Sequence, residues 1–213
     1  MTPRTALFIA PFLVIATQAQ VVDVLPDRII KAGKAEVTMV AVAPKGDRIL
    51  VATDQGAGLY DIESGRKVQE FPYDEDGSTV VWYAAFNDNG EFVVLIGRTG
   101  KREVWDVKSG KTDKMLNKHR WIPDPRATKA LGLDMSNSEF DRFYQQSTAD
   151  NEGITAQAVK DGAVEFKDGE GKVLQRLEFP ENRDQHHRAP CLFQDVWFIT
   201  GTDDGRVLFY KVR

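Results

Sequence analysis

The stretch VWYAAFNDNG at residues 81–90 is followed by FVVLIGRTG at 92–100 and by EVWDVKSG at 103–110. Each piece contains a short run of aliphatic or aromatic residues and ends at a glycine. Such runs, bounded by Gly, Asn and Asp, are typical of β-strands joined by tight turns. The stretch therefore predicts three consecutive strands of one antiparallel sheet.

The same pattern occurs earlier, as VTMVAVAPKG at 37–46, RILVATDQG at 48–56 and GLYDIESG at 58–65. A fourth run follows each of these copies. The end of the chain repeats the pattern, and a degenerate copy precedes it. Fixed-period self-similarity indicates a repeat architecture. The sequence predicts four repeats, at about 34–72, 79–117, 127–179 and 186–213.

An aromatic residue marks the third run of every copy. These residues are Tyr60, Trp105, Phe166 and Tyr210, separated by 45, 61 and 44 residues. The long middle spacing leaves room for an extra hairpin of about 16 residues around residues 154–159. We expect the four rings to be buried between neighbouring sheets, because each offers a large apolar area.

The final copy ends after its third run, whereas residues 27–31 form an isolated run ahead of the first copy. We expect residues 27–31 to complete the last sheet, which would cover a strand edge that is otherwise exposed. No sustained helical periodicity occurs after residue 20, so the predicted fold class is all-β.

These repeats resemble those of WD40-type β-propellers and of the related YVTN-type propellers of exported bacterial proteins. The resemblance rests on the first strands at 37–46 and 81–90, on the Asp203-Asp204-Gly205 turn, and on Tyr60-Asp61 and Trp105-Asp106 in place of the family's Trp-Asp pair. It implies a small β-propeller of about four four-stranded blades, closed by the N-terminal strand. The chain lacks the Gly-His pair that usually opens a repeat.

Residues 1–19 have the layout of a secretory signal peptide. Arg4 precedes an apolar run at 6–16, and Thr17 and Ala19 supply small residues before the expected cleavage point. The run is too short for a bilayer core, which takes about 20 residues, and no transmembrane segment is expected. We therefore expect one domain, residues 20–213, in an exported protein that is periplasmic or secreted.

The composition excludes several classes of function. The chain has 28 Lys and Arg against 32 Asp and Glu, for a net charge of −4. Nucleic acid is not an expected partner, because phosphate recognition needs a concentrated basic face. The single cysteine, Cys191, excludes an intramolecular disulfide and a multi-cysteine metal site. No cofactor is expected, since no phosphate loop, dinucleotide motif or nucleophile elbow is present.

Two groups of residues could bind a metal ion. Residues 74–77, Asp-Glu-Asp-Gly, place carboxylates beside a glycine but without the alternation of a calcium loop. His186 and His187 are adjacent, and adjacent side chains on an extended segment point to opposite faces. We expect solvated linkers at both places and assign no metal ligands.

Aromatic residues outside the repeat register are candidates for an interaction surface. Trp82 and Tyr83 are adjacent, so one of them should face away from the layer that the other joins. Trp121 lies in a linker beside His119. Burial of these rings in the core is the alternative, because large aromatic residues are mostly interior. The candidate surface comprises Trp82, Tyr83, His119, Trp121, His186 and His187.

We expect a non-catalytic protein-interaction module whose loops bind another protein or an envelope component. The alternatives are a lactonase- or quinoprotein-like hydrolase or oxidoreductase, and a propeller that binds a carbohydrate or another small ligand. No catalytic residues are assigned. A monomer is favoured over a strand-exchanged dimer, in which the N-terminal strand would complete the partner's last blade.

Overall fold

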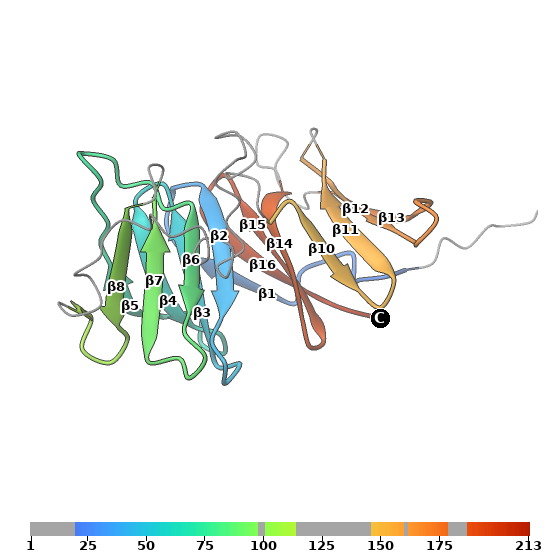
Figure 1. The fold of residues 1–213 in the computed structure, drawn as a ribbon. Coiled ribbons are helices and arrows are strands. Elements are labelled where there is room, and N and C mark those ends of the chain that lie inside the picture. The colour runs from blue at the N-terminus through green and yellow to red at the C-terminus, as the bar shows by residue number, and fades with distance from the viewer. Residues whose placement is uncertain (1–19, 98–100, 114–145, 160–161, 179–186) are drawn as a thin grey trace, which may run out of the picture.

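The computed structural model describes residues 20–97, 101–113, 146–159, 162–178 and 187–213, which form strands and turns (Figure 1). The strands build four four-stranded antiparallel sheets. Sheet 1 contains β2 (Val37–Val42), β3 (Arg48–Thr53), β4 (Gly56–Asp61) and β5 (Lys67–Phe71). Sheet 2 contains β6 (Tyr83–Phe86), β7 (Phe92–Ile96), β8 (Arg102–Asp106) and β9 (Lys111–Thr112). Sheet 3 contains β10 (Thr148–Asn151), β11 (Ile154–Ala158), β12 (Val164–Lys167) and β13 (Val173–Leu177). Sheet 4 contains β14 (His187–Gln194), β15 (Trp197–Thr202), β16 (Arg206–Lys211) and β1 (Arg28–Lys31).

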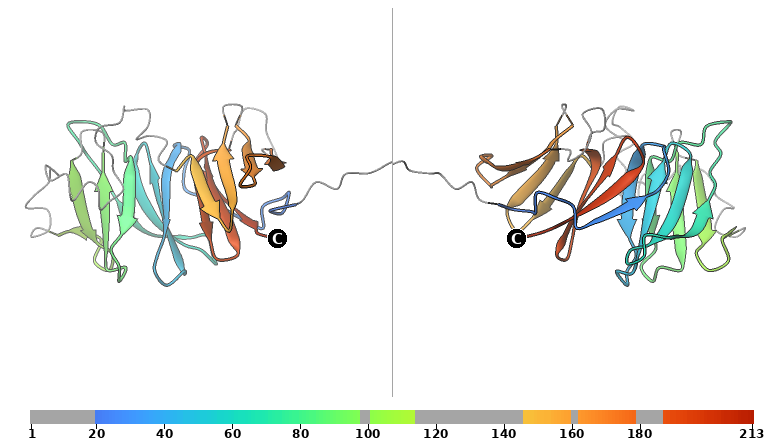
Figure 2. Two further views of the ribbon diagram at one scale, coloured as in Figure 1. Left: turned by 45° about the vertical axis from the view of Figure 1, so that its right-hand side comes forward. Right: turned by 180° about the vertical axis from the view of Figure 1, so that it is seen from behind.

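The sheets stand side by side like the blades of a propeller (Figures 1 and 2). Sheet 2 neighbours sheet 1, sheet 1 neighbours sheet 4, and sheet 4 neighbours sheet 3, because their first strands β6, β2, β14 and β10 contact one another in that order. Within each sheet the remaining strands follow outward from the first strand. The predicted all-β fold with four four-stranded blades is therefore confirmed.

Strand β1 completes sheet 4, as the sequence predicts. Ile30 pairs with Val207, and Arg28 pairs with Phe209. The N-terminal segment stays on β16 beyond the strand itself, since Val22 forms a bridge with Val212. The edge of the last strand is thus covered by residues of the same chain, which removes a template for aggregation.

Gly205 lies where the N-terminal segment meets the turn between β15 and β16. Its φ is +82°, and a Cβ at this position would lie 2.8 Å from the backbone of Gly33. Its carbonyl accepts a hydrogen bond of 2.8 Å from the backbone N–H of Ala32. The positive φ and the close approach of another backbone both require glycine here.

Hydrophobic cores fill the three inter-sheet contacts named above. Tyr60 is buried between sheets 4 and 1, and Trp105 between sheets 1 and 2. Phe166 and Tyr210 are both buried between sheets 3 and 4. The predicted burial of the four repeat aromatics is confirmed. Phe166 nevertheless packs on a different side from the other three. Its ring lies against Phe198 of sheet 4, the next sheet in the sequence and not the preceding one, with ring centroids 4.9 Å apart.

The third sheet includes the hairpin that the long repeat spacing predicts, but as two of its four strands and not as an addition. Strands β10 and β11 occupy residues 148–158 and precede β12 in the sheet. Ala156 of β11 pairs with Phe166 and is fully buried, so the hairpin contributes to the core beside sheet 4. Residues 127–145 of the predicted repeat lie outside the described residues.

The two faces of sheet 3 have opposite character. Val164 and Phe166 of β12 face the core beside sheet 4, and the alternate residues of the strand face away from it. On that second face Glu165 forms ion pairs with Lys167, at 3.1 Å, and with Arg176, at 2.9 Å. This face of sheet 3 is therefore charged, whereas the face on sheet 4 is apolar.

Candidate functional site

Trp82 and Tyr83 lie at the start of sheet 2. Tyr83 is the first residue of β6, and the next residue, Ala84, is buried in the core beside sheet 1. Side chains alternate along a strand, so the Tyr83 ring lies on the opposite face, as the sequence predicts for one of the pair. The ring is partly buried, and loss of water contact raises the pKa of its hydroxyl. The backbone N–H of Trp82 donates to the carbonyl of Ile96 at 2.9 Å.

Of the other four predicted surface residues, the structure places the backbone of His187 alone. His119, Trp121 and His186 lie outside the described residues. His187 begins β14, where its backbone pairs with Thr202. Trp82 and Tyr83 therefore lie together only because they are adjacent in the sequence. A single surface formed by all six candidate residues stays a prediction.

The acidic segment 74–77 is a hydrogen-bonded turn. The Asp74 carboxylate accepts the backbone N–H of Gly77 at 2.9 Å, and Glu75 pairs with Ser78 through two backbone hydrogen bonds. The side chain of Glu75 is 4% exposed. The backbone N–H of Lys101 donates to this carboxylate at 3.4 Å. Within the described ranges, no cluster of three His, Cys, Asp or Glu residues could hold a metal ion.

Asp61 and Asp106 each follow one of the repeat aromatics, and their carboxylates hold turns in the same way. Asp61 accepts the backbone N–H of Ser64 at 2.7 Å, and Asp106 accepts that of Ser109 at 2.6 Å. Hydrogen bonds from the hydroxyl and the backbone of each serine lower the pKa of the neighbouring carboxyl group. These acids therefore support the blade geometry, as side-chain acceptors in turns commonly do.

Cys191 is not a reactive thiol in the folded protein. Its side chain is 2% exposed, and burial raises the pKa of the thiol to about 12. The thiolate is the nucleophilic form, so the group is inert near neutral pH. None of the described segments is a helix long and apolar enough to cross a bilayer.

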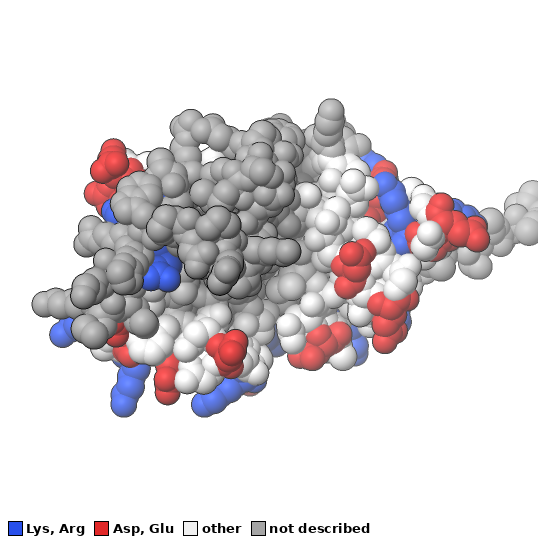
Figure 3. All heavy atoms as spheres, viewed as in Figure 1, with Lys and Arg blue, Asp and Glu red and all other residues white. Residues whose placement is uncertain are grey.

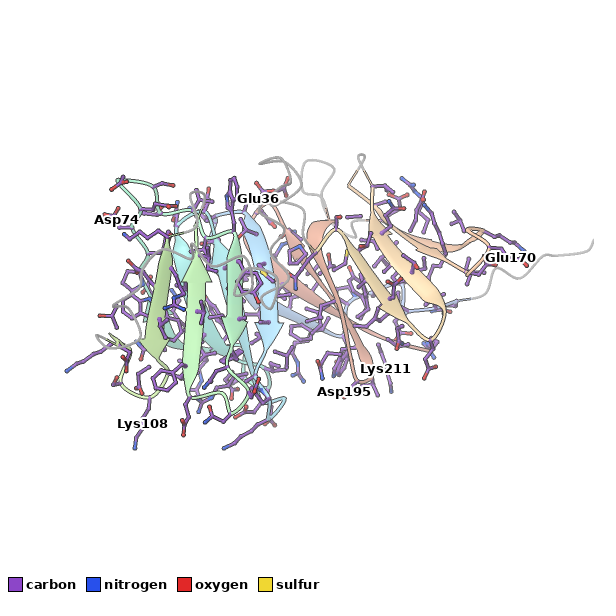
Figure 4. All side chains as sticks on the ribbon, in the orientation of Figure 1. Glu36, Asp74, Lys108, Glu170, Asp195 and Lys211 are labelled. Atoms are coloured by element: carbon purple, nitrogen blue, oxygen red, sulfur yellow. The ribbon has the colours of Figure 1, made fainter. Side chains whose placement is uncertain are left out.

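A cleft of about 760 Å³ opens between sheets 1 and 2 at the ends of their strands. Lys108, labelled in Figure 4, lies at its edge, so the cleft is on the lower side in that view. The turns from β2 to β3 and from β6 to β7 form two of its walls. The segment that follows β8 and part of β5 form the others. No short sequence motif marks this cleft, because it is assembled from turns of two different repeats.

The floor of the cleft is apolar and is continuous with the core. Phe86 and Val107 line it while packing against the core between sheets 1 and 2. Phe92 also lines it and is partly exposed, and Val68 of β5 is 47% exposed. Its volume lies within the range of about 300 to 1,000 Å³ that is common for binding sites.

The rim of the cleft is charged. Three cations, Lys45, Arg48 and Lys108, are balanced by three carboxylates. Figure 3 shows such a mixture of basic and acidic side chains along the lower side of the molecule. An apolar floor with a polar rim is the usual anatomy of a protein contact site. The carboxylates are those of Asp47, Glu91 and Asp106.

No family model and no curated protein matches this chain. Among solved structures, it is similar to one described as the structure of U3-55K, with 14% sequence identity and a TM-score of 0.38. The alignment covers 81% of this chain and 50% of that one, so the chain spans about half the length of its match.

Proposed function

We propose that this chain is an exported WD40-like propeller that acts as a non-catalytic protein-interaction module, with the cleft between sheets 1 and 2 as its contact site. The observation that carries this proposal is the combination of a hydrophobic floor and a charged rim on packed, hydrogen-bonded blades. Turns held on a rigid scaffold are common places for binding function.

The WD40 relationship is supported by a backbone hydrogen bond that occurs at the same place in the first two repeats. In the turn after β4 the backbone N–H of Gly65 donates to the carbonyl of Asp61, and in the turn after β8 that of Gly110 donates to Asp106, each at 2.9 Å. Export is supported by the layout of residues 1–19. Mass spectrometry of the mature protein tests export, and the expected N-terminus is Gln20.

Site-specific photo-crosslinking in the producing cell tests the contact site. A benzophenone amino acid replaces Val68 in the cleft in one variant. In the control variant it replaces Glu170, an exposed residue on sheet 3 that is remote from the cleft (Figure 4). We expect a discrete crosslinked protein from position 68 and none from position 170. Equal crosslinking from both positions, or none from position 68, would contradict the proposal.

A further inference from the structure

We infer that Asn89, in the turn between β6 and β7, is a site of deamidation, and that the folded turn protects it until the turn opens. Asn89-Gly90 is the only Asn-Gly pair in the sequence. Asn89 is exposed and belongs to the wall of the cleft. The inference does not depend on the proposed function. It concerns a covalent change that the chain undergoes by itself.

The reaction needs only the chain and water. The backbone nitrogen of Gly90 attacks the side-chain carbonyl carbon of Asn89 and gives up its proton. The side-chain nitrogen takes up that proton and leaves as ammonia, so that a succinimide ring remains. Water then opens the ring at either carbonyl, which yields aspartate or isoaspartate. Glycine favours the first step, because no Cβ shields its nitrogen.

The turn engages all three atoms that the first step uses. The N–H of Gly90 donates to the carbonyl of Asn87 at 3.0 Å, so the proton of the attacking nitrogen is held. The Asn89 side-chain oxygen accepts the backbone N–H of Glu91 at 3.1 Å, and its nitrogen donates to the Glu91 carboxylate at 2.8 Å. The amide has to leave both partners on residue 91 to reach the Gly90 nitrogen.

Neighbouring residues hold the turn in this form. The N–H of Asn87 donates to the carbonyl of Phe92 at 3.0 Å, and the N–H of Phe92 donates to the Asn87 side-chain oxygen at 2.9 Å. Gly90 has a φ of +73°, and a Cβ there would lie 3.1 Å from Pro44. Asn89 and Glu91 are nevertheless exposed, and exposed segments open at a lower cost than the core. Local opening of the turn therefore exposes the site without unfolding the sheets.

Deamidation would prevent the same turn from forming again. An aspartate at position 89 cannot donate to the Glu91 carboxylate, and two neighbouring carboxylates repel. An isoaspartate lengthens the main chain by a carbon atom, which displaces the partners on Asn87 and Phe92. The rim of the cleft would gain a fourth carboxylate beside its three cations. The modification thus changes both the shape and the charge of one wall.

Peptide mass spectrometry measures the reaction. Tryptic digestion releases residues 68–98, in which Asn87 and Asn89 are the asparagines. The purified protein is incubated at pH 8 in native buffer and in urea, and fragment spectra show which amide has become an acid. We expect Asn89 to react in urea while Asn87, which precedes Asp88, reacts far less. In native buffer the reaction of Asn89 should be on the order of tenfold slower or more, because it requires local opening.

Two variants of Glu91 test the protecting hydrogen bond. Glu91→Ala removes the acceptor of the Asn89 amide, whereas Glu91→Gln keeps a side-chain oxygen that can accept it. Each native rate is divided by the rate of the same variant in urea. We expect this ratio to rise several-fold in Glu91→Ala and to stay near that of the unmodified protein in Glu91→Gln. Gly90→Ala, measured in urea alone, should slow the reaction because its Cβ hinders the attack.

The outcomes address the site and its protection separately. An unreacted Asn89 in urea, or equal reaction of Asn87 and Asn89, overturns the assignment of the site. Equal rates for Asn89 in native buffer and in urea overturn the protecting role of the turn. Equal ratios in the two Glu91 variants would show that the bond to the carboxylate gives no protection.

Discussion

The side-chain amide of Gln175 and the backbone of Val22 exchange two hydrogen bonds. The N–H of Val22 donates to the Gln175 amide oxygen at 2.8 Å, and the amide nitrogen donates to the Val22 carbonyl at 2.9 Å. The same oxygen accepts the N–H of Val21 at 2.7 Å. The N-terminal segment is therefore attached to sheet 3 by this side chain as well as to sheet 4 by strand pairing.

Replacing Gln175 by Ala should destabilise the protein. The substitution leaves buried backbone groups of Val21 and Val22 without partners, and each such group costs about 1–3 kcal/mol. Urea unfolding followed by circular dichroism measures the loss. Gln194→Ala is the control, because the side chain of Gln194 bonds only an exposed neighbour, Asp195. Similar losses in the two variants would contradict this account.

The adjacent residues Ile29 and Ile30 give a matched test of the N-terminal strand. Ile30 is fully buried in the core between sheets 4 and 1, whereas Ile29 is 36% exposed. We expect Ile30→Ala to reduce the free energy of unfolding by about 2–5 kcal/mol. Ile29→Ala should cost much less. If the midpoints of thermal unfolding shift equally, β1 does not complete sheet 4 in solution.

Tyr60 predicts a loss of stability at high pH. Burial, followed by the charge of Glu70, raises the pKa of its hydroxyl from 10.0 to about 12. Between these values the unfolded chain releases the proton and the folded chain keeps it, so the free energy of unfolding falls as pH rises.

The variant Tyr60→Phe isolates this effect. At pH 7 it should be less stable by about 0.5–1.5 kcal/mol, because the hydroxyl donates to the carbonyl of Ala32 at 2.8 Å. The difference in free energy of unfolding between this variant and the unmodified protein should narrow between pH 10 and 12. Denaturant unfolding at a series of pH values measures it, and parallel curves would refute the assignment.

Cys191 should resist thiol reagents as long as the protein is folded. Its burial and raised pKa keep the thiolate form scarce and out of reach of the reagent. At pH 8 we expect negligible reaction with an aromatic disulfide reagent in native buffer and one equivalent in urea. Rapid stoichiometric reaction of the native protein would show that the core between sheets 3 and 4 opens readily.

Residues 20–213 should be monomeric. Strand β1 pairs with β16 of its own chain. The face of sheet 3 that carries the ion pairs would lose its contact with water if it packed against an apolar sheet of a second molecule, and this desolvation is costly. Light scattering at low concentration should give the mass of one chain. A stable dimer would favour the strand-exchanged arrangement.

The sheets with regular alternation and glycine turns were predictable from the sequence. Sheets 1, 2 and 4 follow the runs that end at Gly46, Gly90 and Gly205. Sheet 3 was harder, because β10 reads TADN and offers little apolar signal. Its hairpin turn has positive φ at both Glu152, 48°, and Gly153, 82°. Glutamate is an unusual choice at such a position, where Asn or Asp is more common.

The candidate site was much less predictable than the fold. Sequence reasoning selected large aromatic and histidine residues, of which Trp82 and Tyr83 are placed by the structure. The cleft instead depends on residues such as Val68 and Lys45, which are ordinary in sequence. These residues become neighbours only when the turns of sheets 1 and 2 are brought together in the fold. The residue pattern along a single strand does not contain that information.

The pairing of β1 with β16 has a consequence for the order in which the four sheets can form. Ile30 and its partner Val207 lie 177 positions apart in the sequence, so Ile30 is synthesised long before the strand with which it pairs. Sheet 4, to which sheets 1 and 3 both attach, is therefore the last of the four sheets whose strands are all available. Such long-range pairing delays folding. The blade that joins sheets 1 and 3 therefore keeps one open edge until β1 and β16 have both been synthesised and have paired.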